Sequence, residues 1–223
     1  MNKSLKPATK NAAATRKRIL DAALIEFSTY GHGGARVDRI AAAAEASKPM
    51  IYSYFGDREQ LFKAALKEAY VQIRAGERQI DTDHMDPEAA IRALTRFTME
   101  HYIAKPWFIS MLNTENQLGG TTVREIEDLS AIQTPLIKKI EGILAKGVKQ
   151  GVFRAGIAPV DLYITMASLC FFPVSNRHTL RVVFEAPIDE AWLADRADQA
   201  GEMIIRYLRP DPTGTAPPAT DML

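Results

Sequence analysis

The sequence predicts an all-α protein of two parts, a small N-terminal unit of three helices and a larger helical body. Three observations predict this class. Apolar residues recur at three- and four-residue spacings from Arg16 to Leu208, and no stretch shows a clear strand pattern. Capping residues, Gly and Pro punctuate these stretches at helix-length intervals. The composition, with 47% hydrophobic and 25% charged residues in 223, is ordinary for a globular protein with a substantial core.

The first two helices are predicted from their apolar stripes. The first is expected from Arg16 to Tyr30 and ends at Gly31, a residue suited to a left-handed C-cap. The second is expected from Val37 to Glu45. Their inward faces are Ile19, Ala23, Phe27 and Tyr30 in the first helix, and Val37, Ile40, Ala41 and Ala44 in the second.

The third helix is the most informative stretch of the chain. It is expected to begin at Ser47, whose hydroxyl can accept an early backbone N–H, and Pro49 is tolerated in a first turn. Ile51 and Phe55 lie four residues apart and face inward. The outward side chains are then Lys48, Met50, Tyr52 and Tyr54. Because only two or three residues separate this helix from the preceding one, the pair forms a helix-turn-helix.

The rest of the chain also reads as helical. A long connecting helix is expected from Arg58 or Glu59 to about Ile80. Asp86-Pro87 and Thr134-Pro135 both resemble an N-cap followed by Pro at the first helical position. The further helices are expected at 86–105, 107–118, 123–132, 134–151, 159–174 and 187–208.

Residues 15 to about 67 closely resemble the TetR family of transcriptional repressors. The residues that carry the resemblance are Phe27, Gly31, Val37, Ile40, Ala41, Ala44, Ser47, Ile51, Tyr52, Tyr54, Phe55, Asp57, Arg58, Glu59 and Leu61. The resemblance implies a helix-turn-helix DNA-binding domain at 15–60 and an effector-binding and dimerisation domain at 61–209. It also implies a repressor that binds a palindromic double-stranded DNA operator as a homodimer and is released by a small molecule.

The resemblance places DNA contacts on the second and third helices. Lys48, Pro49 and Met50 would face base edges, Tyr52 and Tyr54 would touch backbone or bases, and Arg58 would bind phosphate. The full set of candidates is Arg36, Val37, Ser47, Lys48, Pro49, Met50, Tyr52, Tyr54 and Arg58. A Lys at the start of such a helix can donate to guanine O6 and N7. Two positions depart from the family pattern: Glu45 stands where the turn usually has Gly, and Val37 where a Thr usually offers a hydroxyl.

Charge is distributed unevenly along the chain. Residues 1–67 hold 12 Lys or Arg and 6 Asp or Glu, a net charge of +6, which leaves −5 for the remaining 156 residues of a chain with net charge +1. A basic N-terminal part favours a polyanionic partner. Residues 1–14 lack periodicity and are expected to form a flexible basic arm. A helical protein that binds DNA without sequence preference would explain this charge as well, but not the ordered string from Lys48 to Arg58.

The body is expected to hold the effector and the dimer interface. Its order of helices resembles that of the regulator of pyrimidine utilisation and its relatives. The pocket candidates are Phe97, Tyr102, Trp107, Phe108, Met111, Asn113, Met166, Cys170 and Asn176, a mostly apolar set suited to a hydrophobic or amphipathic effector. The helices at 159–174 and 187–208 are more apolar than one core requires and are the expected dimer interface. Residues 210–223, rich in Pro, Gly and Thr, are expected to be a disordered tail.

The competing class is a helical enzyme that processes a small molecule, and the sequence gives it little support. The four His residues are scattered without metal-ligand spacing, so no metal, cofactor or catalytic residue is predicted. Cys170 lies on an apolar helix and fits a buried structural cysteine. A single cysteine excludes an internal disulfide. No apolar run is long enough to span a bilayer and no secretory signal is present, so no membrane partner and a cytoplasmic location are expected.

Overall fold

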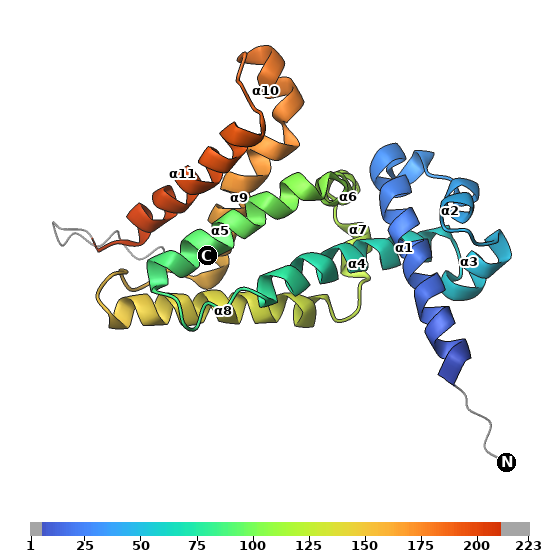
Figure 1. The fold of residues 1–223 in the computed structure, drawn as a ribbon, viewed down its shortest axis with the longest axis horizontal. Coiled ribbons are helices and arrows are strands. Elements are labelled where there is room, and N and C mark those ends of the chain that lie inside the picture. The colour runs from blue at the N-terminus through green and yellow to red at the C-terminus, as the bar shows by residue number, and fades with distance from the viewer. Residues whose placement is uncertain (1–5, 211–223) are drawn as a thin grey trace. The chain divides into compact units, whose positions relative to one another are not determined.

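The computed structural model describes residues 6–210 and confirms the all-α class. Within these residues the chain forms eleven helices and no strand (Figure 1). The helices are α1 (Lys6–Gly34), α2 (Val37–Ala43), α3 (Lys48–Phe55), α4 (Arg58–Arg78), α5 (Pro87–Ala104), α6 (Pro106–Gln117), α7 (Thr121–Arg124), α8 (Leu129–Lys149), α9 (Pro159–Ser175), α10 (Arg177–Val183) and α11 (Glu190–Leu208). The described residues divide into two compact units, residues 6–75 with 104–132 and residues 76–103 with 133–210.

The first unit is built around α1, which packs against α2 and α6. Phe27 of α1 and Phe62 of α4 are fully buried, with ring centroids 5.0 Å apart. The unit contains α6 and α7 as well as the helix-turn-helix, so its core extends beyond the domain boundary expected at residue 60. Tyr70 and Phe108 pack edge to face at 6.2 Å and join α4 to α6 within this unit.

Helix α1 differs from the expected helix at both ends. It begins at Lys6, so residues 6–14 are helical where an irregular arm was expected. Alanine has the highest helix propensity, and the run Ala12-Ala13-Ala14 extends the helix toward the N-terminus. Residues 1–5 of the expected arm lie outside the described residues. At the other end Gly31 has a φ of 67° and a ψ of 176°, which kinks the helix, and one further turn continues to Gly34.

The connection between α6 and α7 lies in the first unit and turns at two glycines. Gly119 and Gly120 have φ of 71° and 73°, and the Glu115 carboxylate accepts the Val123 N–H at 2.9 Å. The prediction of one continuous helix at 123–132 is wrong. α7 ends at Arg124, and a break at 125–128, where Asp128 has a φ of 61°, separates it from α8.

The second unit has a core formed by α5, α8, α9 and α11. Its members are Ala90, Ile91, Leu94, Leu136, Ile140, Ile143, Leu144, Phe153, Leu162, Met166, Ile204, Ile205 and Leu208. Phe153 lies over Gly147 of α8, where a Cβ would come within 2.0 Å of the ring. Burial of this apolar set supplies the main driving force for folding the unit.

Two lysines of α8 hold the connector between α4 and α5. Lys139 donates from Nζ to the carbonyl oxygens of Glu77 and Ile80 at 2.9 and 2.5 Å. Lys146, two turns further on, donates to two more carbonyl oxygens of the connector at 3.0 and 2.7 Å. Lys139 thus binds a carbonyl of the last turn of α4, at Glu77, and the other three carbonyls lie in the connector.

Proline and a short helix account for the remaining differences in the second unit. The helix start predicted at Thr134-Pro135 is wrong: α8 begins at Leu129 and Pro135 lies inside it. Pro173 lies within α9, which continues to Ser175. α10, which no sequence pattern predicted, follows at once. Of the tail expected at 210–223, residues 211–223 lie outside the described residues.

Candidate nucleic-acid interface and effector site

Helix α3 presents one face to the core and one to the outside. Ser47 caps it by accepting the Met50 N–H at 3.3 Å, and Pro lies in its first turn, as predicted. Ile51 and Phe55 are buried. The exposed face includes Met50, Tyr52 and Tyr54, whose residues are 42%, 44% and 37% exposed. This is the geometry of a helix that can enter a groove with its side chains already displayed.

The turn before α3 adopts the backbone conformation that Gly favours, although it carries Glu. Glu45 has a φ of 49°, and the Ala46 N–H reaches back to the Ala41 carbonyl at 3.0 Å. Glu45 therefore occupies a left-handed position within a hydrogen-bonded turn. This conformation imposes strain, because a Cβ is unfavourable in the left-handed region.

A buried carboxylate joins α1 to α2. Glu26 Oε1 accepts the Arg36 backbone N–H at 2.8 Å and the Arg39 Nε–H at 2.8 Å. Burial alone would raise the pKa of Glu26, but these hydrogen bonds and the positive charges of both arginines outweigh it and lower the pKa. These contacts of Glu26 with Arg36 and Arg39 were not predicted from the sequence. The available signal was a charged residue next to Phe27, on the buried side of the first helix.

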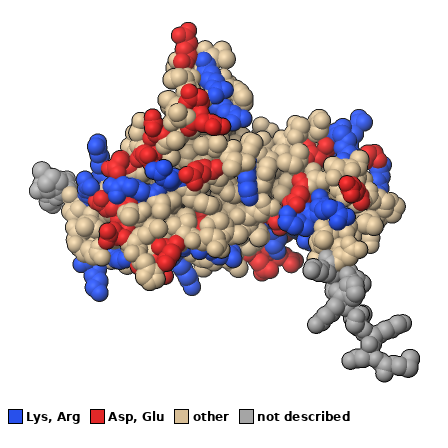
Figure 2. Space-filling model, viewed as in Figure 1, with Lys and Arg blue, Asp and Glu red and all other residues tan. Residues whose placement is uncertain are grey.

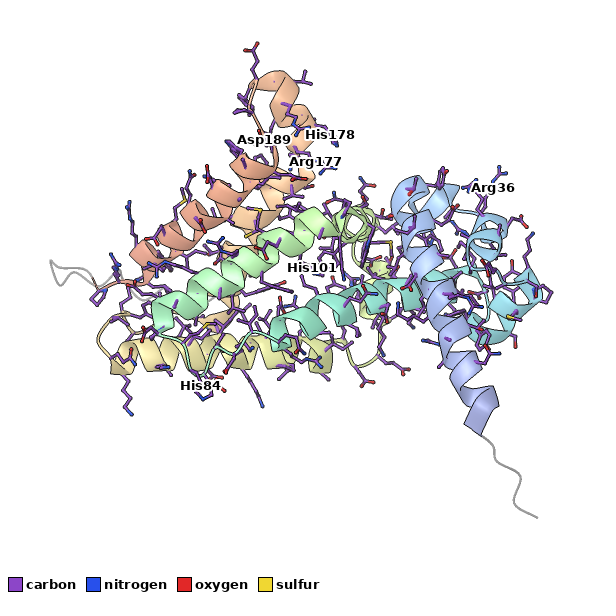
Figure 3. All side chains as sticks on the ribbon, in the orientation of Figure 1. Arg36, His84, His101, Arg177, His178 and Asp189 are labelled. Carbon is purple, nitrogen blue, oxygen red and sulfur yellow. The ribbon has the colours of Figure 1, made fainter. Side chains whose placement is uncertain are left out.

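The residues predicted to contact DNA differ in their exposure and in their partners within the protein. Lys48 is exposed and forms an ion pair with Asp38 of α2, whose carboxylate raises the pKa of the Lys48 ammonium. Arg36 lies at the start of α2 with an exposed side chain (Figure 3). Pro49 and Ser47 are also exposed. Val37 is only 8% exposed, so its side chain belongs to the core.

Arg58 makes contacts within its own unit. It donates from Nε to the Ala35 carbonyl at 3.4 Å and from Nη1 to Glu59 at 2.9 Å, and it lies 5.7 Å from the centre of the Phe27 ring. Its side chain is 29% exposed. To bind a DNA phosphate, the Arg58 guanidinium would have to do so alongside its contacts with Ala35, Glu59 and Phe27, or give them up.

The predicted effector residues fall into both units. Trp107, Phe108, Met111 and Asn113 belong to the first, and Phe97, Tyr102, Met166, Cys170 and Asn176 to the second. In the second unit Tyr102 meets Phe171 edge to face at 6.2 Å, and Phe97 covers Gly76.

Three of these candidates pack in the core or form hydrogen bonds to the backbone of the second unit. Met166 lies in the core of the second unit. Cys170 donates from Sγ to the Thr95 carbonyl at 3.6 Å, and burial raises the pKa of its thiol to about 12. Asn176 ends α9 and donates from Nδ2 to the Phe172 carbonyl at 3.2 Å. All nine residues stay predictions for the pocket.

Buried polar groups that were not among the predicted pocket residues lie on α5 and α6. Thr98 and His101 of α5 are 1% and 7% exposed (His101 is labelled in Figure 3). Glu115 of α6 is 3% exposed, and its Oε2 has no hydrogen-bond donor among the described residues. A buried acceptor such as Glu115 Oε2, in the first unit, is of the kind that anchors the polar part of a ligand in a mostly apolar site.

An exposed apolar surface covers α9, α10 and α11 in the second unit. Its members are Val160, Ile164 and Phe172 on α9, Val182 and Val183 of α10 with Phe184 after it, and Met203 and Tyr207 on α11. A groove of about 420 Å³ lies between these helices and is lined by Leu169, Phe172, Pro173, Leu180, Phe184 and Trp192 among others. A surface of this kind marks an interaction site more often than a solvated face.

Neither a metal centre nor a membrane span is found within residues 6–210. No group of three or more His, Cys, Asp or Glu side chains in this range is arranged to hold a metal ion. None of the helices in the same range is long and apolar enough to cross a membrane.

Comparison with known proteins identifies both parts of the chain. The family model described as "Bacterial regulatory proteins, tetR family" matches residues 19–65, and that described as "Tetracyclin repressor-like, C-terminal domain" matches residues 87–204. The HTH-type transcriptional repressor NicS of Pseudomonas putida is 34% identical over 201 residues, which are 90% of this chain and 95% of NicS.

Two more distant relatives extend the comparison. The HTH-type transcriptional regulator RutR of Escherichia coli, the regulator of pyrimidine utilisation, is 25% identical over 206 residues, 91% of this chain and 94% of RutR. The structure of the transcriptional regulator FadR of Bacillus subtilis in complex with stearoyl-CoA superposes with a TM-score of 0.67 at 16% identity, over 85% of this chain and 97% of FadR. That likeness shows the shared fold.

Proposed function

This chain belongs to the TetR family of helix-turn-helix transcriptional regulators, and from that premise we propose that it represses transcription by binding a palindromic operator as a homodimer, and that a small-molecule effector releases it. The observation that carries the proposal is α3, a capped helix with two buried apolar residues and an exposed face of one Lys, one Met and two Tyr. NicS, the relative 34% identical to this chain, bears the name of a repressor.

The proposed division of roles on the DNA follows from side-chain exposure. Lys48, at the first turn of α3, donates to base edges, and Tyr52 and Tyr54 pack against sugar and phosphate. Lys48→Ala should lower the affinity for the selected operator by about 5- to 100-fold and relax base preference at one position of each half-site. Lys17→Ala, which removes an exposed Lys of α1 paired with Asp21, is the matched control and should lower the affinity for all sequences alike.

The proposed homodimer uses the exposed apolar surface of the second unit. Val160 and Ile164 lie four residues apart on α9, which places them on one face, Phe172 is a third exposed residue of this helix, and Met203 and Tyr207 lie four apart on α11. The packing of α9 against α11 brings both helices into one layer. Two recognition helices about 34–36 Å apart are needed to enter successive major grooves, which a two-fold dimer provides.

Charge placed in this surface tests the dimer. Ile164→Asp should convert the protein to monomer in sedimentation experiments and abolish cooperative binding to a palindromic duplex. Val148→Asp, which charges an exposed apolar residue of α8 in the same unit, is the control and should leave the dimer intact. A dimer that survives Ile164→Asp, Phe172→Asp and Met203→Asp would exclude this surface as the interface.

The proposed release by an effector rests on the chain path and on the family. Helix α4 begins directly after the helix-turn-helix and continues across the boundary between the two units. An effector that binds one arrangement of α4 better than another shifts the spacing of the two DNA-binding domains and lowers operator affinity. A small molecule that binds tightly and leaves operator affinity unchanged would show that no coupling exists.

DNA binding without sequence preference is the second candidate function, and the net charge of +6 over residues 1–67 favours it. The two candidates differ in a measurable way. Phosphate contacts alone give a steep salt dependence and no preferred site, whereas base readout adds roughly 4–10 kcal/mol over random DNA.

A further inference from the structure

Lys48 is the one basic residue of the α3 sequence, and its side chain is paired with a carboxylate. Its Nζ forms an ion pair with Oδ1 of Asp38, which lies on α2. The Lys48 side chain is 46% exposed and the Asp38 side chain 68%, so both groups lie on the outer surface of the helix-turn-helix. Tyr52 lies one turn after Lys48 on α3.

The placement of Asp38 is costly for a protein that binds a polyanion. A carboxylate at this position approaches the phosphates together with Lys48 and opposes the attraction that Lys48 provides. Figure 2 shows acidic side chains beside the basic ones over this unit, and the pairs Lys17–Asp21 and Arg58–Glu59 are further cases. Asp38 differs from these acidic residues because its partner, Lys48, lies on α3, the helix proposed to read the bases.

The geometry of an ammonium group makes this pair useful for reading bases. Lys has three N–H donors. Asp38 uses one of them and fixes the position of Nζ, and the other two remain available to the paired O6 and N7 acceptors of guanine. On non-specific DNA, a Lys48 ammonium group that moves to a phosphate would leave Asp38, and the unpaired carboxylate would then face the DNA backbone.

We propose that Asp38 is a specificity-determining residue, which acts through Lys48 by holding its ammonium group for a guanine edge and by opposing its use on phosphates. The proposal rests on the proposed DNA-binding function and adds to it a device against non-specific binding. Asp38 contributes selectivity in this way through a repulsive term, the means by which many specific interfaces reject the wrong partner. It is a positioning residue, since the contact to the base belongs to Lys48.

The test compares Asp38→Asn with wild type on two duplexes, the sequence enriched by wild type from a random pool and a random duplex of equal length. Asp38→Asn should raise the affinity for random DNA about 3- to 10-fold and change operator affinity less than about 2-fold, so that discrimination falls. The plot of log K against log salt for random DNA should steepen by about 0.9 for each protomer whose Lys48 then engages a phosphate.

Asp21→Asn is the matched control, because it removes the same charge from the same unit and frees an exposed Lys that is not on α3. It should raise the affinity for both duplexes alike. In the Lys48→Ala background, Asp38→Asn should change discrimination by less than about 2-fold. Asp38→Glu, which keeps the carboxylate, should restore most of the discrimination.

Each remaining outcome is decisive. Unchanged discrimination in Asp38→Asn would overturn the proposal, and so would an equal fall in Asp21→Asn or an equal fall without Lys48. These results would leave the proposed function standing as long as wild type still enriches a sequence. If wild type enriches none, the proposed function fails and the role of Asp38 fails with it. Circular dichroism of Asp38→Asn should match wild type, since an exposed pair contributes little to stability.

Discussion

Replacing Glu26 by alanine should destabilise the helix-turn-helix unit by about 2–3.5 kcal/mol. The buried carboxylate of Glu26 accepts the Arg36 backbone N–H at 2.8 Å, and the loss of such a charged hydrogen bond costs about 1.5–3 kcal/mol. The buried methylene that is also removed adds about 0.8 kcal/mol. The gain in helix propensity of alanine over Glu offsets a few tenths of a kcal/mol. The Arg39 guanidinium is too exposed for its pairing to change this sum much.

The assay is urea unfolding of the full-length protein followed by circular dichroism. Glu26→Gln keeps an acceptor for the Arg36 N–H and should lose about 1 kcal/mol, and Asp21→Ala, an exposed acidic residue of the same helix, should lose less than about 0.5 kcal/mol. A loss in Glu26→Ala no larger than that in Asp21→Ala would refute the reasoning.

The pH dependence gives an independent check. The pKa of Glu26 is lower in the folded protein than its ordinary value of 4.5, so its ionised form is stabilised by folding. The contribution is fully present above pH 4.5 and is lost as the pH falls through the lower, folded-state pKa. The stability difference between wild type and Glu26→Gln should therefore be largest near pH 7 and shrink in acid. A difference that is constant down to pH 3 would contradict the assigned role.

Three further predictions follow from local geometry. Glu45→Gly should stabilise the protein by about 0.5–1 kcal/mol in urea unfolding, because it relieves a φ of 49° at a modest entropic cost; a destabilising effect would argue against strain there. Cys170 should react with a thiol reagent at pH 8 more than about 100-fold more slowly in the folded protein than in urea, because burial raises its pKa to about 12; equal rates would show an accessible thiol. Gly147→Ala should cost more than about 2 kcal/mol because its Cβ would meet the Phe153 ring, whereas Gly142→Ala on the same helix meets nothing within 4 Å and should gain up to about 1 kcal/mol; similar effects at both would refute the packing argument.

The helix-turn-helix could be predicted from sequence because its information is local. Ser47, Pro49, Ile51 and Phe55 each fix a cap or a face within one helix, and the structure places all four as expected. The resemblance to the TetR family is confirmed by family models over both parts of the chain. Capping and periodicity operate over three or four residues, so they can be read without knowledge of the tertiary structure.

Features that depend on distant residues were not predictable in the same way. Glu26 lies ten residues from Arg36 and thirteen from Arg39, and nothing local shows that its carboxylate faces them. Pro135 resembled a helix start, but a proline can also lie inside a helix whose packing compensates for the lost hydrogen bond.

The short helix α10 was not predicted, and the sequence does not define which residues of the body would line a pocket. α10 has seven residues, and Thr179, Val182 and Val183 have low helix propensity, so its formation depends on its packing against α9. Apolar residues are favoured in a protein core and in a ligand pocket alike, so their presence in the sequence does not distinguish the two. Met166 and Cys170 illustrate this, since both were pocket candidates and both have core surroundings.

The most direct test of the account is selection of bound duplexes from a random DNA pool by the purified full-length protein at near-physiological salt. A palindrome with half-site centres one helical turn apart, read by two copies of α3, is the predicted result. Lys48→Ala should then lose preference at one position in each half-site. Retained binding without an enriched sequence, or no binding to any duplex, would contradict a sequence-reading dimer.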